Sequence, residues 1–135
     1  MKTLKCLAAG LAMVALCGTT LADWVEIERF EDGMRVFADA TTARRSGDTA
    51  QLVHLVRWGE PQVELGLQPY LSTRVTAAYD CVGKQERYLA STSYAGAMGT
   101  GARVVADNDE AIAWYSISAS SMEEKLWKIA CAQHY

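Results

Sequence analysis

The sequence predicts an α+β fold, a single antiparallel β-sheet of about six strands with one C-terminal α-helix packed on it and tied by a disulfide. Three observations lead to this class. Short runs of strand-forming residues recur along the chain and are separated by glycine, proline and other turn residues. Serine and glutamate near the C-terminus have the spacing that begins a helix. Cys81 lies in a predicted strand, and Cys131 lies in the predicted helix.

The first 22 residues have the three parts of a secretory signal peptide. Lys2 and Lys5 supply a positive start, and residues 6–16 form an uncharged, mostly apolar run. This run is too short to span a membrane, because a spanning helix takes about 20 apolar residues. Small residues then lead up to Asp23, so we expect cleavage between Ala22 and Asp23. The protein would then be exported to the periplasm, the cell surface or the extracellular space.

A lipoprotein is the competing interpretation of this leader, with Cys17 acylated after cleavage. That processing favours a small residue before the cysteine, whereas Leu16 stands there. The alternative therefore has less support than a cleaved signal peptide.

The expected mature domain, residues 23–135, is long enough for one modest core. Removing 22 of the 135 residues leaves 113. Losing Lys2 and Lys5 leaves 11 of the 13 basic residues against 16 acidic ones, a formal charge of −5. Because the basic residues form no stripe, nucleic acid is not an expected partner.

The first three predicted strands follow one another closely. Residues 24–30 and 34–39 flank Asp32-Gly33, a strong hairpin signal because glycine accepts the positive φ of such turns. A turn at residues 46–48 leads into the third strand, residues 49–58. We expect this strand to end at Gly59-Glu60-Pro61, since proline cannot donate to a sheet ladder.

The remaining strands are separated by glycine-containing turns. Val75, Ala77, Tyr79 and Cys81 alternate along one face of the fourth strand, residues 72–82. The other expected elements are a loop or short edge segment at 63–71, a fifth strand at 85–94, a flexible connection at 96–101, a sixth strand at 102–106 and a strand-like or irregular segment at 112–118.

The C-terminal helix has two candidate starts. Ser120 with Glu123, or Ser121 with Glu124, has the spacing of a capping box. The apolar face that follows at helical spacing comprises Met122, Leu126, Ile129 and Ala130. Cys131 lies beside this face, in the last turn.

Two cysteines remain once Cys6 and Cys17 leave with the signal peptide. In an oxidising compartment Cys81 and Cys131 are expected to pair. Two free buried thiols are the alternative, and a zinc site would need more ligands than two cysteines supply.

The third strand has apolar residues on both faces, with Leu52, Val56 and Trp58 on one and Val53 and Leu55 on the other. A sheet covered by one helix has only one dry face. The pattern therefore predicts either a cover on both sides or a subunit interface at Val53 and Leu55, which would make a homodimer.

Catalytic signals are absent from the sequence. His54 lies within an apolar strand, where a packed imidazole is the simpler interpretation, and no serine or cysteine hydrolase motif occurs. The glycines of residues 96–101 lead into a strand and not into a phosphate-binding helix. Residues 107–110 (DNDE) are mostly acidic but lack the spacing of a calcium loop. We expect no enzyme, no metal and no cofactor.

The order of these features resembles the surface-adhesin protein E family over nearly all of residues 23–135. The residues that carry the resemblance are the Trp24 strand with its Asp-Gly hairpin, residues 36–45 (VFADATTARR), Trp58 with Pro61-Gln62, residues 79–81 (YDC), residues 88–93 (YLASTS), Ala113-Trp114 and residues 128–131 (KIAC). The resemblance implies an antiparallel sheet, a C-terminal helix tied by Cys81 and Cys131, dimers, a lipid anchor, and binding of host matrix and plasma proteins. This sequence departs from the family in its leader and in having no lysine-rich stretch between Trp58 and Ser72.

We therefore expect an exported module that binds a protein partner, similar to a surface adhesin. An alternative is a periplasmic inhibitor of a hydrolase, which would present the loop 96–101 to its target.

Overall fold

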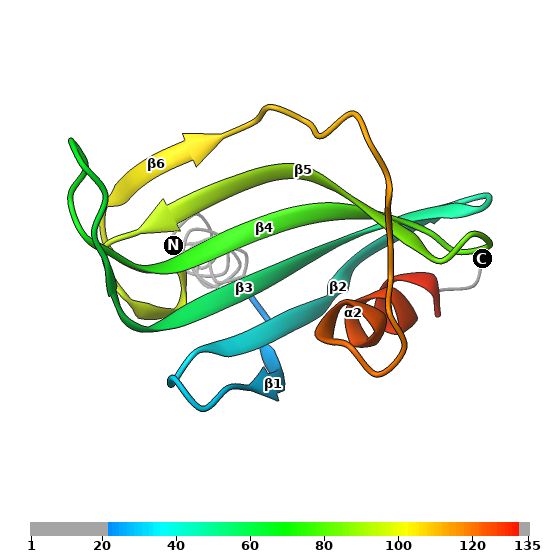
Figure 1. Cartoon of the computed structure of the whole chain (residues 1–135), viewed down its shortest axis with the longest axis horizontal. Coiled ribbons are helices and arrows are strands. Elements are labelled where there is room, and N and C mark those ends of the chain that lie inside the picture. The colour runs from blue at the N-terminus through cyan, green and yellow to red at the C-terminus, as the bar shows by residue number, and fades with distance from the viewer. Residues whose placement is uncertain (1–21, 133–135) are drawn as a thin grey trace, which may run out of the picture.

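In a computed structural model that describes residues 22–132, six β-strands form one antiparallel sheet in chain order and helix α2 packs on one face (Figure 1). The predicted fold class is confirmed. The elements are β1 (Val25–Arg29), β2 (Arg35–Ser46), β3 (Thr49–Gln62), β4 (Tyr70–Asp80), β5 (Gln85–Tyr94), the 3-10 turn η1 (Ala97–Gly99), β6 (Arg103–Asp107), β7 (Tyr115–Ser116) and α2 (Met122–Cys131). The two-residue β7 pairs with β5. Apart from Ala22, the predicted signal peptide with Cys6 and Cys17 lies outside the described residues.

The hairpin between β1 and β2 forms as predicted. Gly33 has φ +90°, and its N–H donates to the Phe30 carbonyl over 3.1 Å. The Asp32 carboxylate accepts the Met34 N–H at 3.0 Å. A Cβ on Gly59 would lie 2.3 Å from the Asp32 carbonyl oxygen, so the end of β3 packs directly on this turn.

Strands β2 and β3 run further than predicted. Between Asp39 and Arg44 the register of β2 shifts, yet the strand continues to Ser46. The Thr42 hydroxyl donates to the Asp39 carbonyl at 2.7 Å and accepts the Val53 N–H at 2.9 Å, in place of a backbone partner. In β3 the pairing breaks after Arg57 and resumes at Gln62, so Pro61 lies where no ladder bond is needed.

One core joins α2 to the sheet. Leu126 and Ala130 of α2 are buried against Leu52 and Tyr79, and Met122 and Ile129 lie partly buried beside them. Figure 1 shows α2 lying across one end of the sheet, with the connection from β6 crossing the same side. The opposite face of the sheet is free of α2. No helix in residues 22–132 has both the length and the apolarity to cross a membrane.

Candidate functional site

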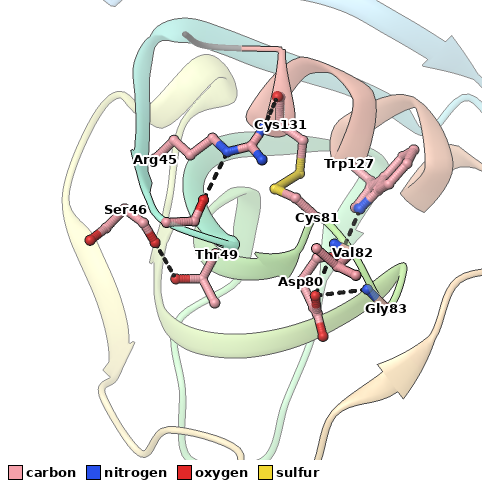
Figure 2. Close-up of a disulfide and its surroundings, with 10 residues drawn as sticks. Arg45, Ser46, Thr49, Asp80, Cys81, Val82, Gly83, Trp127 and Cys131 are labelled. Carbon is pink, nitrogen blue, oxygen red and sulfur yellow. Dashed lines mark hydrogen bonds between the residues drawn. A yellow bond between two sulfur atoms is a disulfide. The ribbon is translucent and has the colours of Figure 1, made fainter. Parts of the chain in front are cut away.

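The predicted disulfide is present between Cys81 and Cys131, whose Cα atoms are 5.7 Å apart (Figure 2). Cys81 follows β4 and Cys131 ends α2, so the bond ties the last turn of the helix to the end of the sheet. The Cys81 N–H donates to the Asp48 carbonyl at 2.8 Å, which places the cysteine beside the β2–β3 turn.

Two side-chain hydrogen bonds lie beside the disulfide, one joining α2 to β2 and the other joining α2 to β4. The Arg45 guanidinium of β2 donates to the Cys131 carbonyl at 2.7 Å, and the Trp127 indole N–H donates to the Asp80 carbonyl at 2.9 Å. Figure 2 shows Arg45 on one side of the sulfur pair and Trp127 on the other. The Arg45 contact also satisfies a carbonyl that the end of a helix leaves without a partner. The helix end is therefore held by one covalent bond and two polar contacts.

The first turn of α2 uses one of the two predicted caps. Ser121 is the N-cap, and its hydroxyl accepts the Glu124 N–H at 3.1 Å. The Glu124 carboxylate accepts the Ser120 N–H at 3.2 Å and pairs with Lys84. The Lys84 hydrogen bond and then the Ser120 N–H hold the pKa of Glu124 at about 2.

Of the two residues predicted at a subunit interface, Leu55 is fully buried within one chain and Val53 is partly exposed. A Cβ on Gly99 would lie 3.7 Å from the Leu55 Cδ1, so η1 packs on Leu55. The two apolar faces of β3 are thus explained in part by a cover on both sides, α2 on one and η1 on the other.

A buried serine holds η1 against the sheet. The Ser72 hydroxyl donates to the Gly96 carbonyl at 2.7 Å and accepts the Gly99 N–H at 2.9 Å. The Thr100 carbonyl accepts the Gly96 N–H at 2.9 Å, which closes the turn. Met98 adopts φ +57°, a conformation that side chains other than glycine rarely take. The segment predicted as a flexible connection is thus bonded internally and to β4.

An open cavity of about 690 Å³ lies on the sheet face opposite α2, between the start of the described chain and η1. Its walls combine aromatic, apolar and charged side chains. The lining residues are Ala22, Trp24, Asp39, Thr41, Arg74, Tyr94, Met98, Gly99 and Thr100.

Asp39 is the only buried carboxylate among the described residues that line this cavity, with 4 % of its surface exposed. Its Oδ1 accepts the Thr41 N–H at 3.0 Å and the Thr41 hydroxyl at 2.5 Å, and its Oδ2 accepts the Asp23 N–H at 3.2 Å. Burial opposes ionisation, but the bonds from Thr41 and Asp23 prevail and lower the pKa of Asp39. The Arg74 guanidinium nearby acts in the same direction. In the sequence, the Asp39-x-Thr41 spacing is typical of an Asx-turn, in which an aspartate side chain accepts the N–H two residues ahead, and it could have predicted this contact.

His54 and Tyr79 are buried polar side chains without a catalytic arrangement. Within residues 22–132, the Nδ1 of His54 and the hydroxyl of Tyr79 have no hydrogen-bond partner. Burial lowers the pKa of His54 to about 4. Neither residue lines the cavity. Within residues 22–132 no three histidine, cysteine, aspartate or glutamate side chains are grouped to hold a metal ion.

The tip of the β3–β4 hairpin exposes apolar side chains that the sequence did not single out. Val63 is 78 % exposed and Leu65 is fully exposed. The tip is held by its own contacts, because the Leu67 N–H donates to the Glu64 carbonyl at 3.1 Å and the Tyr70 hydroxyl donates to the Glu64 carboxylate at 2.9 Å.

Residues 24–132 match the family model described as surface-adhesin protein E. Solved structures of protein E from Haemophilus influenzae share the fold. Crystal form II has a TM-score of 0.64 at 13 % identity, covering 84 % of this chain and 91 % of that one. The selenomethionine form scores 0.63 at 13 % identity, covering 86 % and 92 %. The protein from a non-typeable strain scores 0.61 at 11 % identity, covering 85 % and 79 %. No curated protein sequence matches this chain.

Proposed function

Because the chain belongs to the surface-adhesin protein E family, we infer that it is an exported protein-binding module of the adhesin type. The family is one of adhesins and not of enzymes. The single observation that carries the proposal is the β3–β4 tip, where Val63 and Leu65 project into solvent. Host matrix and plasma proteins are the partners that the resemblance implies.

The tip has the properties of a contact anchor. Leu65 follows Val63 by two residues, on a loop that its own hydrogen bonds hold in place. A pre-ordered loop loses little conformational entropy on binding, and the burial of apolar surface then favours association. The net negative charge and the absence of a lysine-rich stretch leave apolar contact as the main source of affinity at this place.

Inhibition of a hydrolase has less structural support. That alternative requires residues 96–101 to project towards a target, whereas η1 packs on Leu55 and is tied to Ser72. The β3–β4 tip, in contrast, exposes Val63 and Leu65 to solvent.

Self-association forms a second part of the proposal. Leu55 is covered by η1, so Val53 is the apolar residue of that predicted pair which keeps exposed surface for a second copy of the chain.

Binding of immobilised host matrix and plasma proteins tests the adhesin proposal. We expect the wild-type chain to bind at least one protein of such a panel, and Leu65→Ser combined with Val63→Ser to lower the bound fraction at least about tenfold, since each buried aliphatic side chain contributes about 1.5–3 kcal/mol. Val82→Ser is the matched control, because Val82 is 74 % exposed at the turn after β4, the other end of that strand. Absence of binding to the whole panel, or an equal loss with Val82→Ser, contradicts the proposal.

Export with cleavage between Ala22 and Asp23 is the proposed route to this location. Expression of the full chain in a bacterial host and intact-mass measurement of the exported product test it. We expect a mass that begins at Asp23. A product that begins at an acylated Cys17 would instead make the chain a lipoprotein.

A further inference from the structure

We propose that Asp39 forms a binding site for a primary ammonium group, and that the N-terminus of the mature chain occupies it. Cleavage after Ala22 would place the α-ammonium group of Asp23 on the Asp39 carboxylate. The inference rests on the proposed cleavage site and adds what that position does for the folded protein.

The acceptor geometry is already built in the uncleaved chain. The Asp23 nitrogen lies 3.2 Å from the Asp39 Oδ2, and it remains the same atom when the bond to Ala22 is cut. The other oxygen, Oδ1, is held by the Thr41 N–H and hydroxyl. Asp39 therefore presents Oδ2 in a fixed position. Among the described residues, only Asp23 donates a hydrogen bond to this Oδ2.

Cleavage changes the charge of this donor. A backbone amide donates one neutral hydrogen bond, whereas an α-ammonium group carries a positive charge and donates up to three. Charge-assisted hydrogen bonds are about twice as strong as neutral ones. Since Asp39 is only 4 % exposed, water competes weakly for its charge. Among the described residues that line the cavity, the only other cation is Arg74, which is exposed to solvent.

The position of the predicted cut fits this role. Ala22 and Asp23 are exposed, and Ala22 lines the cavity beside Asp39. Removing Ala22 frees the nitrogen and clears one side of the cavity. A cut one residue earlier would leave Ala22 as the terminus, with its charge displaced from Asp39 by one residue.

The test uses chains released from a cleavable fusion, so that the N-terminus does not depend on the natural leader. All the described strands, α2 and the disulfide lie within residues 25–131, so a chain that begins at Asp23 keeps the whole fold. Chemical unfolding is measured for chains that begin at Asp23, at Ala22, and at Asp23 with an acetylated α-amino group. Each is prepared with and without Asp39→Asn.

We expect acetylation, or the extra Ala22, to raise the unfolding equilibrium constant at least about tenfold at pH 7, because a close opposite charge shifts a pKa by about one unit or more. This difference should disappear in Asp39→Asn and above about pH 10, where an α-amino group is neutral. Asp107→Asn is the matched control, because Asp107 also accepts the N–H two residues ahead but lies exposed on β6, at the far edge of the sheet. It should leave the difference unchanged.

Equal stability of the three chains overturns the inference, and so does a difference that persists in Asp39→Asn. Neither result depends on where signal peptidase cuts. A wrong cleavage site would be seen in the intact mass of the exported protein, while the fusion-derived chains would still report on the Asp39 site.

Discussion

His54 is a single side chain that lowers the stability of the folded state at acidic pH. It lies in β3 opposite Ala38 and Val75 and is 8 % exposed, and its Nδ1 has no hydrogen-bond partner in the part of the chain that the structure describes. Burial lowers its pKa from 6.5 to about 4, so the folded state keeps the imidazole neutral while the unfolded state protonates first. As the pH falls from 6.5 to about 4, the unfolded state binds more protons and the native state loses stability.

We predict that the free energy of unfolding contains a loss of about 2 kcal/mol between pH 7.5 and pH 5 that is due to His54. His54→Leu removes the titrating group and keeps the site apolar, so this part of the loss should vanish. Urea unfolding at both pH values measures it. An unchanged pH dependence in His54→Leu would show that other groups cause the loss.

Glu86 has the opposite effect on the pH dependence of stability from His54. It faces α2 next to Tyr79, and burial and then the nearby charge of Glu123 raise its pKa. A raised carboxyl pKa means that the ionised form costs stability in the folded state. Stability is therefore lost as the pH rises from the unfolded pKa of 4.5 through the folded one.

Glu86→Gln should accordingly be more stable than wild type at pH 7, by up to about 0.5 kcal/mol, the usual range for a surface substitution. The advantage should shrink below pH 4.5. Glu110→Gln is the control, because the Glu110 side chain is 62 % exposed. An advantage that persists at low pH would point to packing instead of charge.

At the scale of elements, the contacts that attach α2 to the sheet determine whether this helix stays folded. A helix of 10 residues is marginal alone in water, so it depends on docking. Leu126 and Ala130 supply the apolar contact, and Ser121 caps the start. The disulfide, Arg45 and Trp127 hold the end.

Cys131→Ser should lower the free energy of unfolding by roughly 2–4 kcal/mol, because the disulfide constrains the unfolded chain. Only the hydrogen bonds of Arg45 and Trp127 then hold this end of the helix, so the helix should open locally before the sheet unfolds. Hydrogen exchange of α2 amides, compared with those of β3 and β4, measures this. Cys81→Ser is the matched variant and should have the same effect. Equal protection of α2 in wild type and variants would contradict it.

At the scale of the whole molecule, one sheet has two different covers. α2 covers one face over β2 and β3, and η1 covers part of the other face over β3 and β4. The rest of that second face carries Val53 and the cavity beside Asp39. Any dimer through β3 must therefore use the surface around Val53 and not Leu55.

The proposed dimer predicts that Val53→Asp gives a folded monomer, since a charge without a partner is costly in an interface. Light scattering at high micromolar concentration measures the mass, and circular dichroism confirms folding. Val82→Asp introduces the same charge at an exposed site outside this face and should leave the mass unchanged. A monomeric wild-type chain would rule the dimer out.

Local sequence determined the strands, turns and cap because their signals lie within a few residues. Gly33 takes the positive φ of the hairpin it was expected to form, and Ser121 with Glu124 begins the helix. The pairing of Cys81 with Cys131 could also be predicted, since the expected cleavage leaves no other cysteine. The alternating residues of the fourth strand placed Tyr79 in the core.

Only the tertiary structure decided what covers each face and which distant groups meet. The pattern of Leu55 fitted either a cover on both sides of the sheet or a subunit interface, and η1 covers it from more than 40 residues away in the chain. Thr42 carries β2 past its expected end by bonding across to Val53, and Asp23 meets Asp39 through the pairing of β1 with β2. Periodicity records whether a side chain is apolar, but it does not record which segment will cover it. That is set by long-range contacts, whose energy depends on the whole chain folding at once.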